Sequence, residues 1–452
     1  MPLPVQGGRE KVMDTDETID LSEFSEELAE SQTSESVDES LFTGEAKKEK
    51  TQEQEFSSML HENFSPKQIG SIACYTEPVS VSVALDVVIQ LFKDDESLHA
   101  IPVEENDHVV GFIDRKTVES ASGSMWKRIT SSSIAEFIKK VDVILYAREY
   151  IENNLKKVSD INRKYDINYF PVFNGKSFFG MVSLDDFLDR TAEIREQDLA
   201  KATAIQQSFF PHDSDISSLP YKICFWNQMA NELGGDMINV YKLSDSCSLV
   251  GCFDVSGKNV AASLLTVTVS TFFQSLLATN NKERNPFHII AMLDAYLARV
   301  IPPGNFITAA LCYVDYEKKN FCIFNCGHTT TYLIRKQGDK VFSVSIDPKL
   351  PPLSMGEVHD QLMASLESRD AKHPYNAYKL TSGIHLSMYS DGFTDMKDEQ
   401  GERYEDPRAK EFFMKLYDTP DGEVKGEVEK TVKDWIGTAI LPDDVTVIDV
   451  RF

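Results

Sequence analysis

The chain has 452 residues, of which 42% are hydrophobic and 26% charged, and its formal net charge at pH 7 is −26. The length suggests two or three domains, each able to bury a core. So acidic a surface repels phosphate groups, which argues against nucleic acid and against an anionic membrane as partners. The seven cysteines form no CxxC pair, and no basic segment followed by an apolar one opens the chain. Both features favour reduced thiols and a cytoplasmic location.

The first 60 residues are rich in Glu, Ser, Thr and Asp and contain few aromatic side chains. Such a segment cannot bury enough apolar surface to offset the entropy that folding removes. We therefore predict a disordered acidic tail over residues 1–60.

Residues 65–190 contain two copies of one pattern, in which a helix, a strand, a short turn and a second strand lead into another helix. Each copy has a proline in its first strand, Pro102 and Pro171, and a glycine in its second, Gly111 and Gly180. A repeat of this kind predicts two units packed together. The pattern resembles the CBS-domain pair, an α/β regulatory module. The resemblance implies a sensor that often binds an adenine nucleotide between its repeats.

The second copy ends in the sequence SLDD at 183–186, which is similar to the Ser/Thr-x-x-Asp element that contacts ribose in CBS pairs. The Ser183 hydroxyl and the Asp186 carboxylate could bind two ribose hydroxyls, and the helix N-terminus that follows suits a phosphate. Alternatively, Ser183 caps the helix and Asp186 completes a capping box. The first copy has DRKT at 114–117 instead. We therefore predict at most one adenine-nucleotide site.

Apolar side chains recur at helical spacing over residues 191–211 and Pro211 ends the pattern, which predicts a helical linker. Ile205 is expected on its apolar face. The linker either packs on its own domain or pairs with that of a second copy at a dimer seam. The second interpretation, together with the habit of CBS pairs, favours a homodimer.

Residues 212–452 alternate apolar strand-like runs with a few long helices, a pattern typical of an α+β fold in which helices flank a β-sandwich. The segment 260–279 is apolar nearly all round and is expected to form a buried helix. Ser and Thr interrupt its apolar stretch, so we expect it to be too short and too polar to span a bilayer.

Four aspartates lie at the ends of strand-like runs, beside glycine or at the start of the last strand: Asp236, Asp254, Asp391 and Asp443. One such residue usually forms a turn, but four at neighbouring strand ends would repel one another unless a cation neutralised them. Oxygen ligands without His or Cys suit Mg²⁺ or Mn²⁺. The pattern therefore predicts a two-metal site that activates water for attack at phosphorus. Asp444 is an alternative to its neighbour Asp443.

Eight motifs of this region resemble, in order, those of the SpoIIE/RsbU-like branch of the PPM-type metal-dependent phosphatases. Four of them are ELGGDMINVY, FDVSGKNVAASLL, LTSGIHLSMYSDGFTD and DDVTVIDVRF. The resemblance implies a PPM-type β-sandwich and a protein serine/threonine phosphatase that uses two Mn²⁺ or Mg²⁺ ions and forms no phosphoenzyme. It also implies a phosphorylated protein substrate, commonly a regulator of sigma-factor switching.

The resemblance further implies a role for each candidate ligand. An aspartate at the position of Asp254 bridges both ions, and the carbonyl of the next residue, Val255, completes one coordination shell. Asp391 and Asp443 correspond to the ligands of the second ion. Asp236 corresponds to a residue that reaches metal largely through water. Asp254 and Asp391 are therefore the predicted catalytic residues, and motif register alone favours Asp443 over its neighbour.

The sequence departs from the family pattern at two places. Lys258 and Asn259 follow DVSG, where the family usually has His-Gly. Met237, Ile238 and Asn239 follow GGD, where aromatic residues and a second aspartate are usual. These changes leave a second hypothesis open, a catalytically silent and nucleotide-responsive scaffold. The presence of all four carboxylates favours the enzyme.

Two further side chains have more than one interpretation. His328 either acts as a general acid or fixes a turn. Lys258 is the candidate for binding the phosphate of the substrate, because no arginine is evidently placed for it.

Overall fold

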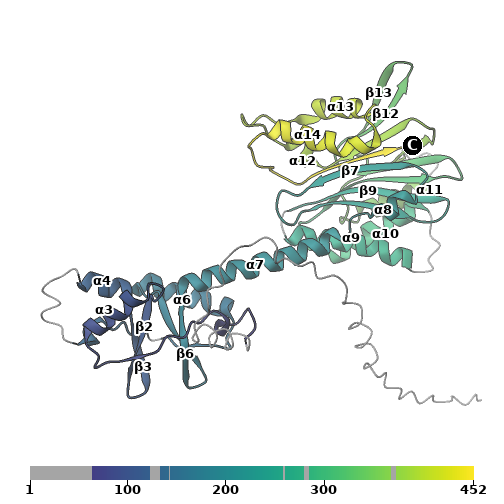
Figure 1. Cartoon of the computed structure of the whole chain (residues 1–452). Helices are drawn as coiled ribbons and strands as arrows, with labels where there is room; N and C mark the ends of the chain where they lie inside the picture. The colour runs from purple at the N-terminus through teal and green to yellow at the C-terminus, as the bar shows by residue number, and fades with distance from the viewer. Residues whose placement is uncertain (1–63, 123–132, 142, 258–259, 279–284, 368–372) are drawn as a thin grey trace, which may run out of the picture. The chain divides into compact units, whose positions relative to one another are not determined.

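The computed structural model of the chain is drawn in Figure 1. It describes residues 64–122, 133–141, 143–257, 260–278, 285–367 and 373–452. The acidic tail predicted over residues 1–60 lies outside the described residues, as do Lys258 and Asn259.

The N-terminal module, residues 64–183, contains two three-stranded sheets with the same topology. In each sheet a short strand runs parallel to the central strand, which pairs antiparallel with the third. The strands are β1 (Val79–Ser80), β2 (Ala100–Glu105) and β3 (His108–Asp114), then β4 (Leu145–Tyr146), β5 (Tyr169–Asn174) and β6 (Ser177–Ser183). The helices are α3 (Leu85–Asp94), α4 (Arg115–Ser122) and α6 (Ile151–Tyr165). The two copies of the sequence pattern thus share one backbone plan.

The glycine of each copy has a steric reason. A Cβ atom at Gly111 would lie 2.5 Å from the carbonyl oxygen of Lys139, and one at Gly180 would lie 2.6 Å from that of Cys74. In both cases another segment of backbone crosses the strand at this point and bonds to it, to Phe112 in the first copy and to Met181 in the second. Only glycine leaves room for so close an approach.

A single helix, α7 (Leu184–Gln207), follows directly after β6. It begins seven residues before the predicted linker because Ser183 caps it. Phe187, Thr191 and Ile194 are buried near its start, and Gln206 is buried at its end. A one-and-a-half-turn helix, α8 (Asp213–Ser217), comes next.

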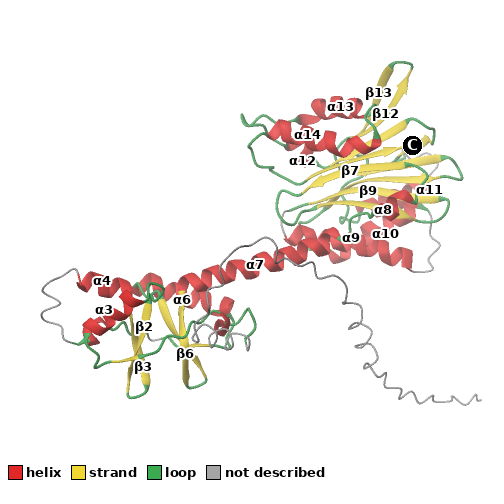
Figure 2. Ribbon diagram, viewed as in Figure 1, coloured by secondary structure: helices red, strands yellow, loops and turns green. Residues whose placement is uncertain are grey.

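The C-terminal region is built on two five-stranded antiparallel sheets, in the orders β14-β11-β10-β9-β8 and β13-β12-β15-β16-β7. Figure 2 shows the strands of this region with helices on both sides of them. Their strands are β7 (Lys222–Gln228), β8 (Asp236–Lys242), β9 (Cys247–Val255), β10 (Ile307–Asp315), β11 (Asn320–Cys326), β12 (Thr331–Gln337), β13 (Lys340–Ile346), β14 (Asn376–Lys379), β15 (Ile384–Tyr389) and β16 (Val445–Arg451). One apolar core lies between the sheets, where Ile238 and Val250 of one sheet pack with Leu386 and Ile448 of the other.

Helices cover the outer faces of both sheets, which confirms the predicted mixed α+β fold of this region. The helices packed on the first sheet are α9 (Val260–Ala278), α10 (Pro286–Val300) and α11 (Glu357–Glu367). Those on the second are α12 (Asp391–Asp395), α13 (Glu405–Leu416) and α14 (Val424–Ile436). Side chains alternate along β8, so Met237 and Tyr241 face the helices while Ile238 and Val240 face the other sheet.

Helix α9 differs from expectation in two respects. Only one face is buried, through residues such as Val269 and Phe273, whereas Leu264 on the opposite face is 63% exposed. The helix is also long and apolar enough to cross a membrane by length and composition, with a mean hydropathy of 1.6, so the expectation that it is too polar was wrong. Its buried face packs on β8 and β9, and a helix in the core of a protein outside membranes can have the same length and composition.

Candidate active site

Two of the predicted aspartates face each other across neighbouring strands. Asp236, the first residue of β8, pairs directly with Asp254 of β9. Directly opposed residues of an antiparallel pair point to the same face, so the two carboxylates share one side of the sheet. Asp236 is only 2% exposed, and its burial together with the charge of Asp254 raises the pKa of Asp236 well above the ordinary value. A bound cation would relieve both effects.

The other two aspartates lie at strand ends of the second sheet. Asp391 begins α12 just after β15, and Asp443 lies just before β16. Ser390 joins the two segments, because its backbone N–H donates to the carbonyl of Thr446 at 3.0 Å and its hydroxyl accepts the N–H of Thr446 at 2.9 Å. The packing is tight, since a Cβ atom at Gly392 would lie 2.0 Å from a carbonyl oxygen of the β16 segment.

Thr446 also joins the two sheets at this end of the sandwich. Its hydroxyl donates to Oδ2 of Asp236 at 2.6 Å. The fold therefore places Asp236 and Asp254 of one sheet at the same end as Asp391 and Asp443 of the other.

The four aspartates fit a divalent cation by the type of their oxygen ligands and lie at the same end of the sandwich, but they do not form a closed cluster. Within the part of the chain that the structure describes, no three His, Cys, Asp or Glu side chains are grouped closely enough to share an ion. Asp236 is held in place by Thr446, whereas Asp254 and Asp443 are half-buried and Asp391 is exposed. Binding of one ion by three of these carboxylates would therefore require them to come closer together than they are in this structure.

Asp444, unlike the candidate ligand Asp443, binds the backbone of a neighbouring loop. Its carboxylate accepts the backbone N–H of Ala230 on one oxygen and that of Gly235 on the other, each at 2.7 Å. The side chain is 7% exposed. With both oxygens engaged in holding the loop between β7 and β8, Asp444 is poorly placed to bind metal, and Asp443 is the better candidate.

The two glycines before Asp236 leave room for this loop. A Cβ atom at Gly234 would lie 2.0 Å from the sulfur of Met229, and one at Gly235 would lie 2.8 Å from the carbonyl oxygen of Val255. Val255 is the predicted carbonyl ligand, and its N–H donates to the carbonyl of Gly235 at 3.2 Å. Glycine at 235 therefore lets the end of β9 approach the start of β8, and glycine at 234 leaves room for Met229 and for the carboxylate of Asp444.

His328 does not have the properties of a general acid. It is 3% exposed, its Nδ1 lies 2.8 Å from the hydroxyl of Thr308, and its backbone N–H donates to the side chain of Asn325 at 2.9 Å. Burial lowers the pKa of His328 to about 4, so the imidazole is neutral near pH 7. These contacts describe a residue that fixes the turn after β11.

Residues 244–452 match the model of one protein family, described as Stage II sporulation protein E (SpoIIE). The matched segment includes Asp254, Asp391 and Asp443, and Asp236 lies shortly before it. This part of the chain is a SpoIIE-type phosphatase domain. The predicted class of enzyme, a protein serine/threonine phosphatase of the PP2C or PPM type, is thereby confirmed.

Several solved structures resemble the SpoIIE-type domain at low identity. The SiaA PP2C domain of Pseudomonas aeruginosa is 18% identical over 58% of this chain and 98% of its own, with a TM-score of 0.48. The PP2C domain and regulatory fragment of SpoIIE from Bacillus subtilis is 16% identical over 52% of this chain and 64% of its own, with a TM-score of 0.41. No curated protein sequence gives a significant match. Roles of individual residues in the domain therefore rest on its geometry.

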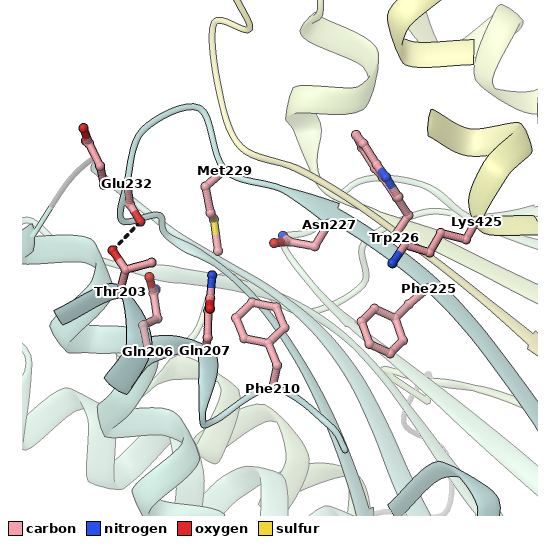
Figure 3. Close-up of a pocket in the computed structure, with 10 residues that line it drawn as sticks. All are labelled: Thr203, Gln206, Gln207, Phe210, Phe225, Trp226, Asn227, Met229, Glu232 and Lys425. Carbon is pink, nitrogen blue, oxygen red and sulfur yellow. Dashed lines mark hydrogen bonds between the residues drawn. The ribbon is translucent and has the colours of Figure 1, made fainter. Parts of the chain in front are cut away.

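The end of α7 grips the loop that leads to Asp236, a contact that the sequence did not reveal. The side-chain amide of Gln206 donates to the carbonyl of Gly234 at 2.7 Å and accepts its N–H at 3.3 Å. The hydroxyl of Thr203 donates to the carbonyl of Glu232 at 2.9 Å (Figure 3). We call these contacts the α7 clamp. Gln206 is 4% exposed, whereas Ile205, expected on the apolar face, is 59% exposed.

A pocket of about 370 Å³ adjoins the α7 clamp (Figure 3). Aromatic side chains form much of its wall, namely Phe210 after α7 and Phe225 and Trp226 on β7. Asn227 and Lys425 contribute polar groups. None of the four candidate aspartates lines this pocket.

In the N-terminal module, Ser183 and Asp186 bind each other. The Ser183 hydroxyl and backbone N–H donate to one oxygen of Asp186 at 2.7 and 2.8 Å, and the N–H of Asp186 donates back to Ser183 at 3.0 Å. This is the capping box that was the alternative to a ribose site. A separate pocket of about 480 Å³ is lined from both repeats, by Asp114 and Lys116 of the first and by Tyr169 of the second, among others.

Proposed function

We propose that the chain is a divalent-cation-dependent phosphoserine/phosphothreonine protein phosphatase, with its catalytic site at the end of the sandwich that carries Asp236, Asp254, Asp391 and Asp443. The directly opposed pair of Asp236 and Asp254, one of them buried, carries this proposal. Like charges held this close at the end of a sandwich need a counter-charge. When bound, Mn²⁺ or Mg²⁺ supplies that charge and activates water for attack at phosphorus.

The chain's own residues would share the work as follows. The carboxylate of Asp254 and the carbonyl of Val255 offer two oxygen ligands for a metal ion from one strand end. Asp391 and Asp443 offer carboxylate ligands from the facing sheet. Asp391 is also exposed, so a phosphorylated side chain of another protein can reach it. Asp236, fixed in place, would act largely through water. By resemblance to the family, we further propose that the substrate is a phosphorylated regulatory protein, such as one in sigma-factor switching.

The altered GGD context does not argue against activity. Asn239 points away from the carboxylates, because it lies on the helix-facing side of β8, where it accepts the hydroxyls of Tyr241 and Ser270. Replacement of a family aspartate by Asn239 therefore leaves the four candidate ligands in place. This observation favours the enzyme over the catalytically silent scaffold.

A metal-depletion assay tests the proposal directly. We expect the full chain, treated with a chelator and dialysed, to release no phosphate from a phosphoserine peptide, and added Mn²⁺ or Mg²⁺ to restore hydrolysis. Calcium, which takes more ligands at longer distances, is the matched control ion. Binding of Mn²⁺ in calorimetry without hydrolysis of any phosphopeptide or of p-nitrophenyl phosphate would instead favour the scaffold.

We also propose that the N-terminal module is a CBS-type sensor that binds an adenine nucleotide and regulates the phosphatase domain through α7. The shared backbone plan of the repeats and the pocket lined from both of them support this proposal. A cytoplasmic homodimer is proposed as well, supported by the exposed apolar side chains Ile205 and Leu264 on α7 and α9.

Nucleotide binding has a simple thermal test. We expect millimolar AMP, ADP or ATP to raise the melting temperature of the full chain, because a ligand that binds only the folded state stabilises it. The Lys116→Ala variant should show a smaller shift, since this side chain is 87% exposed at the pocket and its loss costs the fold little. An unchanged melting temperature with all three nucleotides would contradict the sensor proposal and leave the phosphatase proposal intact.

A further inference from the structure

One chain of two hydrogen bonds, half-buried at Asn227 and buried at Thr446, ends on the carboxylate of Asp236. The side-chain amide of Asn227 donates to the hydroxyl of Thr446 at 2.7 Å, and that hydroxyl donates to Oδ2 of Asp236 at 2.6 Å. Asn227 and Thr446 are direct partners in the register of β7 and β16, so the backbone fixes the first step. Thr446 is fully buried and Asp236 is 2% exposed, so water does not compete for the second step.

We propose that Asn227 and Thr446 are positioning residues that together orient the Asp236 carboxylate for the metal site, an inference that rests on the function proposed above. Neither residue belongs to the predicted ligand set. They act through Asp236, which is held by Thr446 from the facing sheet. We call this arrangement the Asn227 relay.

The Asn227 relay has a fixed direction. An amide nitrogen can only donate, and a hydroxyl has a single proton. Because the Thr446 oxygen already accepts from Asn227, its own proton is directed to Asp236. A carboxylate that serves a bound cation is ionised and only accepts hydrogen bonds, so in the metal-bound state the donors end at Asp236. The hydrogen bond from Thr446 therefore holds one oxygen of Asp236 in place. It keeps the carboxylate beside Asp254 although the two negative charges repel each other.

The expected effect of Asn227 and Thr446 on metal affinity can be taken from similar partners of metal ligands in other proteins. Groups that orient a direct metal ligand typically change metal affinity by about 10- to 100-fold when they are removed, and Asp236, which would act largely through water, should show an effect near the lower end of that range. The Asn227 relay should therefore be visible in metal binding itself, without any assay of turnover. A residue that only filled space in the core would change stability but not the affinity of the folded protein for the ion.

The test is calorimetric titration of the metal-free full chain with Mn²⁺. We expect Thr446→Val, which keeps the shape and removes the hydroxyl, to bind Mn²⁺ about tenfold more weakly. Thr446→Ser, which restores the hydroxyl, should bind close to wild type. Asn227→Asp is nearly the same shape but accepts instead of donating, so it draws the Thr446 proton away from Asp236 and should weaken binding similarly.

A control variant separates the loss of the hydrogen bond to Thr446 from the effect of an added negative charge. Gln228→Glu adds the same charge at the next, exposed residue of β7 and should leave Mn²⁺ affinity unchanged. Wild-type affinity in Asn227→Asp, or an equal loss in Gln228→Glu, would overturn the relay. If Thr446→Val does not fold, Asn227→Asp and Thr446→Ser decide. Failure of the wild-type chain to bind Mn²⁺ would contradict the proposed function rather than the relay.

Discussion

Replacing Asp254 with asparagine is expected to reduce metal-dependent phosphatase activity by about a hundredfold or more. The substitution keeps the shape of the side chain and removes the charge that faces Asp236. Burial and the charge of Asp254 together raise the pKa of Asp236, and the substitution removes the second cause, so the metal-free variant should be at least as stable as the wild type. Loss of activity without loss of stability is the signature of a ligand rather than of a core residue.

Two measurements check this expectation. Phosphate release from a phosphoserine peptide gives the activity, and the melting temperature with and without Mn²⁺ gives the response to metal. We expect Mn²⁺ to stabilise the wild type and to have little effect on Asp254→Asn. Asp245→Asn, at a fully exposed aspartate after β8, is the matched control and should behave as wild type. Unchanged activity in Asp254→Asn would place the catalytic site elsewhere.

Replacing Gln206 with leucine should lower activity by about tenfold although the residue touches none of the aspartates. Leucine has a similar volume, but it leaves the N–H and carbonyl of Gly234 without their partner in a buried place. An unsatisfied buried polar group costs about 1–3 kcal/mol, and about 1.4 kcal/mol corresponds to a factor of ten. The loop would relax to recover these bonds, and Asp236 follows Gly234 by two residues.

The metal dependence of the rate distinguishes this effect from a general loss of stability. We expect Gln206→Leu to require more Mn²⁺ for half-maximal activity, because the loop that positions Asp236 is less well held. Gln207→Leu changes the adjacent exposed residue and should leave the metal requirement unchanged. An unaltered Mn²⁺ requirement in Gln206→Leu would show that the α7 clamp does not reach the site.

The sequence was informative about the carboxylates because their surroundings are local. Asp254 lies at the end of an apolar strand and Asp391 follows another, directly before Gly392, so neighbouring residues alone indicate both strand ends. The choice between Asp443 and Asp444 was different. It depends on backbone N–H groups more than 200 positions away, which no local pattern contains.

Helix α7 shows where periodicity becomes unreliable. Its residues alternate small, polar and apolar side chains with little contrast between faces, so Ile205 was assigned to the buried face and Gln206 to none. The structure reverses the two, because the buried position satisfies the backbone of a loop rather than apolar surface. The Asn227 relay was equally beyond the sequence, since Asn227 and Thr446 are 219 positions apart.

Because α7 is one continuous helix, it fixes both the distance and the rotation between the Ser183 cap and the α7 clamp. Its 24 residues extend about 36 Å from the Ser183 cap to the α7 clamp. Each residue added to a helix turns everything beyond it by about 100°, so an insertion of one residue would carry Gln206 to another side of the helix axis. An insertion of seven residues would return it to within about 20° of its direction. The number of residues in α7 therefore fixes the direction in which Gln206 points around the helix axis. Insertions or deletions in α7 keep that direction only when they add or remove about two whole turns, or seven residues.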